Sequence, residues 1–320
     1  MRAIVVTRSG GPEVLEPAER PEPEPGPGEV LIDVAAAGVN FIDVYYRTGR
    51  YPQELPYTPG VEAAGTVAAV GDGVREFSAG DRVAWANVQG GYAEKAVVPA
   101  DKVVPVPDGV GLDDAAASLL QGMTAHYLTR STYPVQEGDT VLVHAAAGGM
   151  GLLLTQAVKA LGGRVLATAS TPEKEKLAKD AGADVTMGYE GFTDRVRELT
   201  GGEGVAVVYD GVGAPTFDGS LASLRRRGTL ALYGAAGGAV PPFDPQRLNA
   251  AGSVYLTRPS LVHFIERREE LLERAADVYG WVDSGDVKVH VGHRYDLAGA
   301  GTAHTDLEAR RSTGKLLLIP

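Results

Sequence analysis

The stretch Thr140-Val-Leu-Val-His144-Ala-Ala-Ala-Gly-Gly-Met-Gly151 decides the fold. A short apolar run of β type enters a turn of small residues, and an amphipathic run to Leu161 leaves it. The order strand, glycine-rich turn and helix is how a fold places a helix start under a pyrophosphate. We therefore predict a nucleotide-binding turn over Ala147, Gly148, Gly149, Met150 and Gly151.

The glycines of this turn have separate predicted roles. Gly148 and Gly149 would allow a tight turn and a close approach of the backbone to a phosphate, and Gly151 would let the helix pack on its strand. The spacing differs from the common G-x-G-x-x-G pattern. An ordinary strand-to-helix connection, with small residues chosen for packing, stays open as the alternative.

Composition limits the possible classes of protein. The chain has 320 residues, enough for two domains, with 44% hydrophobic and 22% charged residues. Its net charge of -11 argues against nucleic acid or an anionic membrane as a partner. No apolar run approaches the roughly 18 residues of a membrane span, and Met1–Val6 predicts a strand rather than a signal peptide. Without cysteine there is no disulfide, thiolate nucleophile or cysteine-bound zinc, and the simplest interpretation is a cytoplasmic enzyme.

The chain predicts an α/β fold with two kinds of segment. Residues 1–123 are rich in Gly, Pro and short β-type runs, and the tail, residues 259–320, carries two more such runs around helices, so both are assigned to one β-rich domain. Residues 124–258 alternate between strands and helices, which predicts a doubly wound parallel sheet. Its six strands are predicted at Thr140–His144, Arg164–Thr168, Asp184–Thr186, Val205–Asp210, Thr229–Tyr233 and Ser253–Leu256. In the tail we expect a helix from Val262 to about Gly280 and a strand at Lys288–Gly292.

The end of the second of these strands indicates which nucleotide binds. An Asp or Glu there would bind the free 2′-hydroxyl of NADH, but the strand ends Ala167-Thr-Ala-Ser170, and Lys174 follows one turn into the next helix. A hydroxyl and a lysine suit a 2′-phosphate, so we predict NADPH, bound by Ser170 and Lys174. Ser170-Thr-Pro-Glu173 also has the pattern of a helix capping box, and both functions are compatible.

Several motifs together resemble one family. They are Gly38-Val-Asn-Phe-Ile-Asp43 with Tyr45, Pro59-Gly-Val-Glu-Ala-Ala-Gly65, Gly80-Asp-Arg-Val83, Gln121-Gly-Met-Thr-Ala125, the turn above, Tyr209-Asp-Gly-Val-Gly213 and Thr257-Arg-Pro-Ser260. Along essentially its whole length the chain resembles the zinc-independent, zeta-crystallin-like quinone oxidoreductases of the medium-chain dehydrogenase/reductase superfamily. The resemblance implies a GroES-like catalytic domain, an inserted Rossmann domain, NADPH bound in the cleft between them, and a homodimer in which the sheet edge near Ser253–Ser260 takes part.

The resemblance also implies that no metal is bound. Alcohol dehydrogenases of this superfamily hold zinc through Cys and through the His of a Gly-His-Glu motif, which here is Gly60-Val61-Glu62. His290 and His293 lie close in sequence, but no third ligand is evident, so we expect a surface or packing role for them. Reduction of a quinone needs no Lewis acid, because the quinone is a strong hydride acceptor and the hydroquinone oxygen can take a proton from water.

By resemblance, the catalytic residues are Asn40, Tyr45, Tyr51 and Gln121. Asn40 would contact the cofactor or orient the substrate, although it could instead be only a helix N-cap. Tyr45 would stack on the quinone or contact it through its hydroxyl group. Tyr51 and Gln121 would complete the wall of the substrate site. The remaining residues expected to bind cofactor are Thr124, Tyr127, Tyr189, Tyr233, Gly234, Ala235 and Arg310. For Arg310, a solvated charge at a helix end is the open alternative.

Two other functions remain open on the sequence. A related NADPH-dependent enal, enone or enoyl-thioester reductase would also transfer a hydride to an electron-poor acceptor. A basic entrance would favour a thioester of coenzyme A, but the one basic cluster, Arg225-Arg-Arg227, is expected at a helix end in solvent. A non-catalytic crystallin-like or RNA-binding protein is the alternative of another class, and the intact glycine turn and the acidic charge argue against it.

Overall fold

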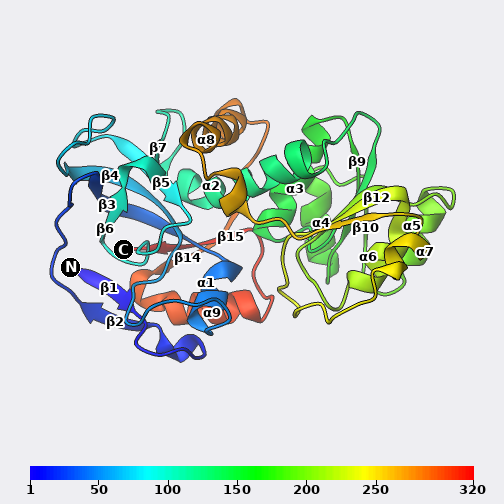
Figure 1. The fold of residues 1–320 in the computed structure, drawn as a ribbon, viewed down its shortest axis with the longest axis horizontal. Helices are drawn as coiled ribbons and strands as arrows, with labels where there is room; N and C mark the ends of the chain where they lie inside the picture. The colour runs from blue at the N-terminus through cyan, green and yellow to red at the C-terminus, as the bar shows by residue number, and fades with distance from the viewer. The chain divides into compact units, whose positions relative to one another are not determined.

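The computed structural model describes residues 1–320, and the chain divides into two compact units. The first unit comprises Met1–Met123 and Ile265–Pro320, and the second comprises Thr124–Phe264 (Figure 1). In this division the first unit resumes at Ile265, six residues after the predicted start at residue 259. Phe264, the last residue of the second unit, stacks its ring on Tyr127 with ring centres 4.1 Å apart.

The second unit is a six-stranded parallel sheet in the order β10-β9-β8-β11-β12-β13. This is the strand order of a dinucleotide-binding fold built from two halves. The α3 and α4 helices contact each other, as do α5 and α6, so the two pairs cover the sheet (Figure 1). The strands are β8 (Thr140–Val143), β9 (Arg164–Thr168), β10 (Val185–Met187), β11 (Val205–Asp210), β12 (Leu224–Leu232) and β13 (Tyr255–Thr257). The helices are α3 (Gly149–Ala160), α4 (Pro172–Asp180), α5 (Phe192–Leu199), α6 (Phe217–Ser223) and α7 (Gln246–Ala250).

The predicted strands of this unit are confirmed to within a few residues, with one informative error. The β12 strand begins at Leu224, so Arg225-Arg-Arg227 lies in a strand and not at a helix end. The three arginines are exposed, and the Arg227 backbone has a positive φ of 59°, where the pairing with β11 is irregular. Three consecutive arginines are compatible with a helix, so nothing in the sequence indicated this irregular strand pairing.

The first unit is built on a mainly antiparallel sheet in the order β14-β15-β3-β4-β5-β7, with β6 paired to β3. A separate two-stranded sheet joins β1 to β2. The strands of the whole first unit are β1 (Arg2–Val5), β2 (Glu16–Glu19), β3 (Glu29–Val39), β4 (Glu62–Val70), β5 (Arg82–Ala86), β6 (Lys95–Pro99), β7 (Val103–Pro105), β14 (Val291–Asp296) and β15 (Lys315–Ile319). The core of the unit includes the fully buried side chains of Trp85 and Tyr92.

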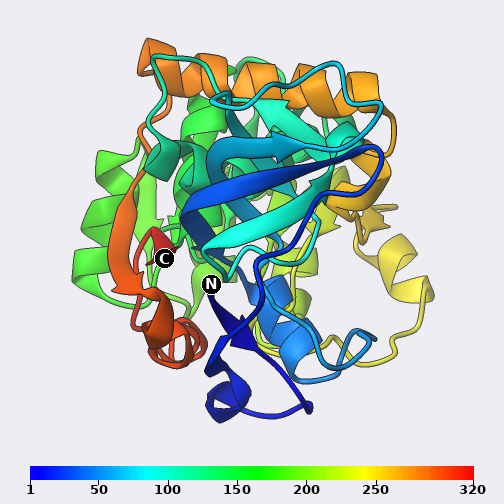
Figure 2. The ribbon, with the colours of Figure 1, turned by 90° about the vertical axis from the view of Figure 1, so that its left-hand side faces the viewer.

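Helices cover this sheet at two places. The short α1 (Phe41–Arg47) contacts α9 (Ala300–Glu308), and α8 (Arg268–Ser284) packs near β7 (Figure 2). The α2 helix (Leu112–Tyr127) runs from the first unit into the second along the chain. The tail helix thus begins at Arg268 rather than Val262, because Leu261–Phe264 forms a separate 3₁₀ turn, and the following strand is Val291–Asp296 rather than Lys288–Gly292. None of the helices has both the length and the apolar character needed to cross a membrane.

Candidate active site

The glycine-rich turn after β8 forms the start of a helix with free main-chain donors. The α3 helix begins at Gly149, with Gly148 as its extended N-cap. The N–H groups of Gly149, Met150 and Gly151 belong to the first turn and have no acceptor in the chain. Because the first turn has no acidic side chain, this helix start suits an anion such as a pyrophosphate.

The tightness of this turn comes from Gly151 and from Ala145. A Cβ on Gly151 would lie 2.4 Å from the Ala145 carbonyl oxygen and 2.5 Å from the Ala146 Cα, so only glycine fits. Ala145 itself has a φ of +51°, in the left-handed region. Gly148, by contrast, has an ordinary φ of -75°, and a Cβ there would meet only the Ala145 carbonyl oxygen, at a tight 3.3 Å. The lack of space at Gly151 fits its predicted role in packing the helix on its strand, and the positive φ of this turn is supplied by Ala145.

Two predicted cofactor residues lie close to the same turn or after the next strand. Tyr189 accepts a hydrogen bond at its hydroxyl from the Ala145 N–H, at 3.1 Å. Ser170 follows β9 and is exposed, and no carboxylate ends that strand. The predicted cap is shifted by one residue: Thr171, not Ser170, caps α4 by accepting a hydrogen bond from the Lys174 N–H at 3.3 Å.

The segment Tyr233–Ala235 follows β12 and packs on the turn after β11. A Cβ on Gly234 would meet the Gly211 carbonyl oxygen at 2.7 Å, so the two turns touch through their backbones. The Asp210 carboxylate holds the turn after β11, because it accepts hydrogen bonds from the main-chain N–H groups of Val212 and Gly213. These turns lie at the carboxyl ends of β11 and β12, where ligands bind in open parallel sheets.

Thr124 and Tyr127 lie on the last turns of α2 and are buried. The Tyr127 ring is stacked on Phe264, with the ring planes 4° apart. Burial raises the pKa of the Tyr127 hydroxyl, so it is neutral near pH 7.

In the first unit, Asn40 is the centre of a buried polar cluster. Its amide nitrogen donates to Glu62 Oε2 at 2.9 Å, and its amide oxygen accepts from Lys315 Nζ at 2.7 Å. Lys315 Nζ and Glu62 Oε2 are 2.5 Å apart, and these side chains are 2% and 0% exposed. A buried ion pair of this kind is favourable only when its remaining hydrogen-bonding positions are filled. Here the Leu120 main-chain N–H donates a hydrogen bond to the other Glu62 oxygen, at 2.6 Å.

The lysine fixes the orientation of two side-chain amides. Lys315 can only donate, so the Asn40 oxygen must face it. Gln121 lies 3.4 Å from that same oxygen and must therefore turn its own nitrogen toward Asn40. The Gln121 oxygen is left buried without a partner, as an acceptor for a ligand donor. Asn40 is also the N-cap residue of α1: its main-chain N–H donates to the Asp43 carboxylate in a capping box, while its side-chain amide bonds to Glu62 and Lys315.

Gly38 makes room for this ion pair. A Cβ at residue 38 would lie 2.4 Å from Glu62 Oε2, 2.7 Å from Lys315 Cε and 2.7 Å from the Ala116 carbonyl oxygen. The φ of this glycine is not in the left-handed region, so the reason for glycine is space. The cluster therefore depends on an absent side chain as well as on the charges.

Tyr45 and Tyr51 form an aromatic group at the end of α1. Their ring centres are 5.3 Å apart in an edge-to-face arrangement, and Tyr46 contacts Tyr51 on another side at 5.7 Å. The guanidinium of Arg50 lies 4.5 Å from the centre of the Tyr45 ring. Both Tyr45 and Tyr51 are partly exposed, so a ligand could reach this group.

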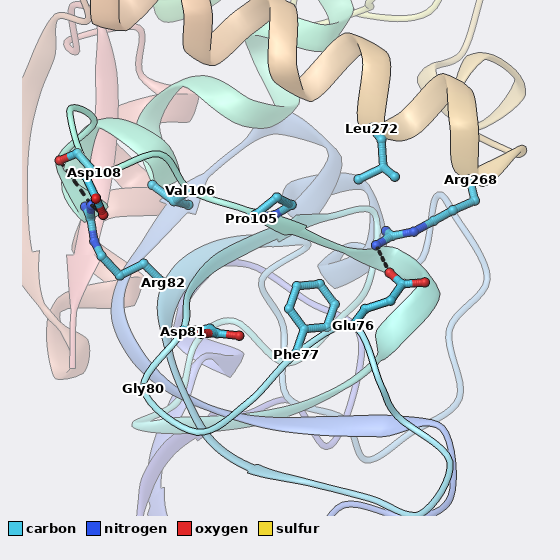
Figure 3. A pocket seen from close by; sticks show the side chains of 10 residues that line it. All are labelled: Glu76, Phe77, Gly80, Asp81, Arg82, Pro105, Val106, Asp108, Arg268 and Leu272. Carbon is cyan, nitrogen blue, oxygen red and sulfur yellow. Dashed lines mark hydrogen bonds and ion pairs between the residues drawn. The ribbon is translucent and has the colours of Figure 1, made fainter.

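Two features of the first unit lie apart from these residues. Arg310 follows α9, is exposed, and has a left-handed backbone with a φ of 56°. A cavity of about 560 Å³ is lined by the ion pair of Arg268 and Glu76, by Phe77 and by Arg82 (Figure 3). None of the predicted site residues lines it, and Arg82 is held by main-chain carbonyl groups.

The structure contains no group of three or more His, Cys, Asp and Glu side chains that could hold a metal ion. Of the histidines, His144 and His304 are fully buried. Burial lowers the pKa of His144 to about 4 and that of His304 to about 3, so both are neutral near pH 7.

Sequence reasoning missed the partners of Asn40. The sequence patterns placed Glu62 only within family motifs and gave no role to Lys315, which lies in one of the two β-type runs of the tail, Lys315–Ile319. One signal was available: a lysine at the head of the apolar run Lys315-Leu-Leu-Leu-Ile319 would be buried with its neighbours and would need an acid.

Comparisons with known proteins identify the two domains. The family model for the alcohol dehydrogenase GroES-like domain matches residues 26–108, and the model for zinc-binding dehydrogenases matches residues 149–277. The first unit is therefore GroES-like, and the second has the Rossmann-type parallel sheet of this superfamily.

Whole-chain relatives narrow the family. The chain is 45% identical over 315 residues to a quinone oxidoreductase of Pseudomonas aeruginosa, with 97% of each chain covered. A mycobacterial protein solved in complex with NADPH has 58% identity and a TM-score of 0.97, with all of both chains covered. Escherichia coli quinone oxidoreductase, also solved with NADPH, has 42% identity and a TM-score of 0.98 at full coverage of both. The chain belongs to the quinone oxidoreductase family of the medium-chain dehydrogenase/reductase superfamily.

Proposed function

We propose that this protein is an NADPH-dependent quinone reductase. The observation that carries the proposal is the start of α3, where three unpaired N–H groups and a Gly151 that tolerates no side chain form a cradle for a pyrophosphate. The relatives described above supply the reaction, since two of them are named quinone oxidoreductases and two were solved with NADPH. When bound, NADPH supplies the hydride from C4 of its nicotinamide ring.

The second unit would hold the cofactor through residues from four turns. The backbone of Ala147–Gly151 would bind the pyrophosphate, and Ser170 and Lys174 the 2′-phosphate, with Tyr189 beside them. The absence of a carboxylate after β9 favours this 2′-phosphate over a free ribose hydroxyl. The other proposed cofactor contacts in this unit are Thr124, Tyr127, Tyr233, Gly234 and Ala235, and Arg310 is a proposed contact from the first unit.

The first unit would orient the acceptor. Asn40 is rigid because Glu62 and Lys315 hold both ends of its amide, and the unpaired Gln121 oxygen beside it can accept a hydrogen bond from a ligand. Tyr45 and Tyr51 would provide an aromatic surface for a planar quinone. The chain would position the reactants and exclude side reactions, and the hydroquinone oxygen would take its proton from water.

We propose that the reaction is independent of zinc. The chain has no cysteine, and Val61 stands at the position of a zinc-ligating histidine in the alcohol dehydrogenases that it resembles. The buried cation beside Glu62 is the Lys315 ammonium. Activity should therefore survive dialysis against a strong chelator.

The test is oxidation of NADPH, followed by its absorbance, with a panel of acceptors. The panel contains 1,4-benzoquinone, 9,10-phenanthrenequinone, 2-hexenal and crotonyl-CoA, with NADH as the control donor. Fast turnover of a quinone with NADPH is expected. Turnover of the enal or thioester alone would replace quinone reduction by double-bond reduction, and no turnover at all would indicate a non-catalytic protein.

We also propose a homodimer and a cytoplasmic location. The β13 strand is an edge of the sheet in the second unit, and Tyr255 on it is 62% exposed. A second copy could pair along that edge and cover this ring. Light scattering should give a dimer mass that falls to the monomer mass in Tyr255→Lys, whereas a monomeric wild type would contradict the dimer. The lack of cysteine fits the reducing cytoplasm.

A further inference from the structure

A chain of buried polar side chains lies behind Asn40 and is not part of the proposed reaction. It runs from Asp43 on α1 to Tyr92, to His304 on α9, and back to Arg47 on α1. All four residues are at most 1% exposed. Arg47 ends the chain in a two-point ion pair with Glu308, at 2.8 and 2.9 Å, whose side chain is 33% exposed.

The direction of every hydrogen bond in this chain follows from Arg47. A guanidinium only donates, so His304 Nδ1, 3.1 Å away, must be an acceptor. The single proton of the neutral ring is then on Nε2, which donates to the Tyr92 oxygen at 3.1 Å. The Tyr92 O–H must in turn donate to Asp43 Oδ2, also at 3.1 Å. Because arginine does not release a proton, this series of hydrogen bonds cannot carry protons inward from Glu308. Its role is to hold side chains in place.

Asp43 connects this chain to the candidate site. Its carboxylate accepts the main-chain N–H of Asn40 at 2.9 Å and that of Val61 at 3.2 Å. Glu62 directly follows Val61 in the sequence. The Asn40 side-chain nitrogen donates to the Glu62 carboxylate at 2.9 Å in the Asn40 cluster. One carboxylate therefore ties together the two backbone segments whose separation sets that hydrogen bond.

We propose that Tyr92, His304 and Arg47 are positioning residues that hold the Asp43 carboxylate, and through it the relative placement of Asn40 and Glu62 on which hydride transfer to the acceptor depends. The inference rests on the proposed function for its reaction, but it adds residues that touch neither cofactor nor acceptor. Three groups donate to Asp43, so the network favours and is best satisfied by its ionised form.

The groups that face Asp43 fix how that charge state responds to pH. Burial raises its pKa to about 6, opposed by the N–H groups of Asn40 and Val61, by the Lys315 charge and by the Tyr92 hydroxyl. Burial, with a smaller contribution from the Asp43 charge, raises the pKa of two further tyrosines, Tyr46 and Tyr57, so both stay neutral. Loss of the Tyr92 donor should therefore move the Asp43 pKa upward.

The experiment compares Tyr92→Phe with Tyr295→Phe. Both remove one phenol donor from a carboxylate in the same unit, because Tyr295 donates to Asp306 on α9 at 2.7 Å, away from the network. We expect Tyr92→Phe to lower kcat about tenfold, the loss typical of a hydrogen bond to a charged group, with the KM for NADPH changed less than about twofold. The acid limb of the kcat/KM profile should move to higher pH. Tyr295→Phe should change neither.

A second variant protects the test against loss of folding. His304→Gln keeps an acceptor for Arg47 and a donor for Tyr92, and should retain both the kcat and the acid limb of the wild type. Equal effects in Tyr92→Phe and Tyr295→Phe, or an unmoved acid limb in Tyr92→Phe, would overturn the proposal. Inactivity of the wild type with all quinones would instead overturn the proposed function, and the same profiles would then be read with whichever acceptor of the panel it reduces.

Discussion

The two units bury their polar groups in different ways. In the second unit, Asp210 is satisfied by neighbours within ten residues: the N–H groups of Val212 and Gly213 and the hydroxyls of Thr216 and Ser220. In the first unit, Glu62 is paired with Lys315, 253 residues away in the chain. The second unit satisfies this acid through local turns, whereas the first unit satisfies its acid with a charge from a distant segment. Damage to the two units should therefore differ in size and in kind.

The largest effect is expected from breaking the buried ion pair. Lys315→Met leaves Glu62 buried without its counter-charge, which should lower the free energy of unfolding by about 3–5 kcal/mol. Urea denaturation measures this loss. The double variant Glu62→Gln with Lys315→Met should recover most of it, because no unpaired charge remains. If the free energy of unfolding of Lys315→Met lay within about 1 kcal/mol of the wild-type value, the ion pair would not be a major source of stability.

Acid should destabilise the protein through its buried histidines. The folded pKa values of His144 and His304, about 4 and about 3, lie below the ordinary 6.5, so the unfolded chain takes up these two protons first as the pH falls. Asp43 acts in the opposite sense, because its folded pKa of about 6 lies above the ordinary 3.8. Between pH 6 and pH 4 the unfolded state thus gains a net of about one proton, and stability should fall by about 1.4 kcal/mol per pH unit.

Denaturation curves at several pH values measure this slope. In His304→Gln one of the two histidine protons is removed from the balance, so the slope between pH 6 and pH 4 should fall close to zero. An unchanged slope would mean that His304 does not stay neutral in the folded protein.

An effect of about 1–3 kcal/mol is expected in the second unit from crowding the glycine turn. The Cβ in Gly151→Ala would overlap the Ala145 carbonyl and displace α3 from the strand. We expect weaker NADPH binding, measured by fluorescence titration, together with lower stability. Gly148→Ala is the matched control, since its Cβ would come no closer than 3.3 Å to that carbonyl. Similar losses in the two variants would mean that the position of α3 does not depend on Gly151.

The smallest effect tests the choice of nucleotide. Lys174→Ala should raise the KM for NADPH about tenfold, the value of one charge-assisted contact, and leave the KM for NADH nearly unchanged. Steady-state kinetics with both nucleotides measure the ratio. Equal changes for the two would remove the 2′-phosphate assignment.

The same contrast explains what could be predicted from the sequence. The order of β8, its turn and α3 was visible because strand, glycines and helix are adjacent in the chain. The role of Ala145 was not visible, because nothing in an alanine signals a positive φ. The Asn40 cluster was found only at Asn40 and Gln121, since Glu62 and Lys315 meet through antiparallel pairing of β15 with β3 and of β3 with β4. Such pairings over long separations leave no local pattern.

The pairing of Glu62 with Lys315 also has a consequence for the order of events during synthesis. A ribosome makes Glu62 first, then the whole of the second unit, and only afterwards Lys315. Until β15 is made, the nascent first unit carries an acid that it cannot bury without its counter-charge. The second unit has all its parts by residue 264, and compact units of this kind generally fold as units during synthesis. The nucleotide-binding unit should therefore become native first, and a chain stalled before β15 should bind NADPH but reduce nothing.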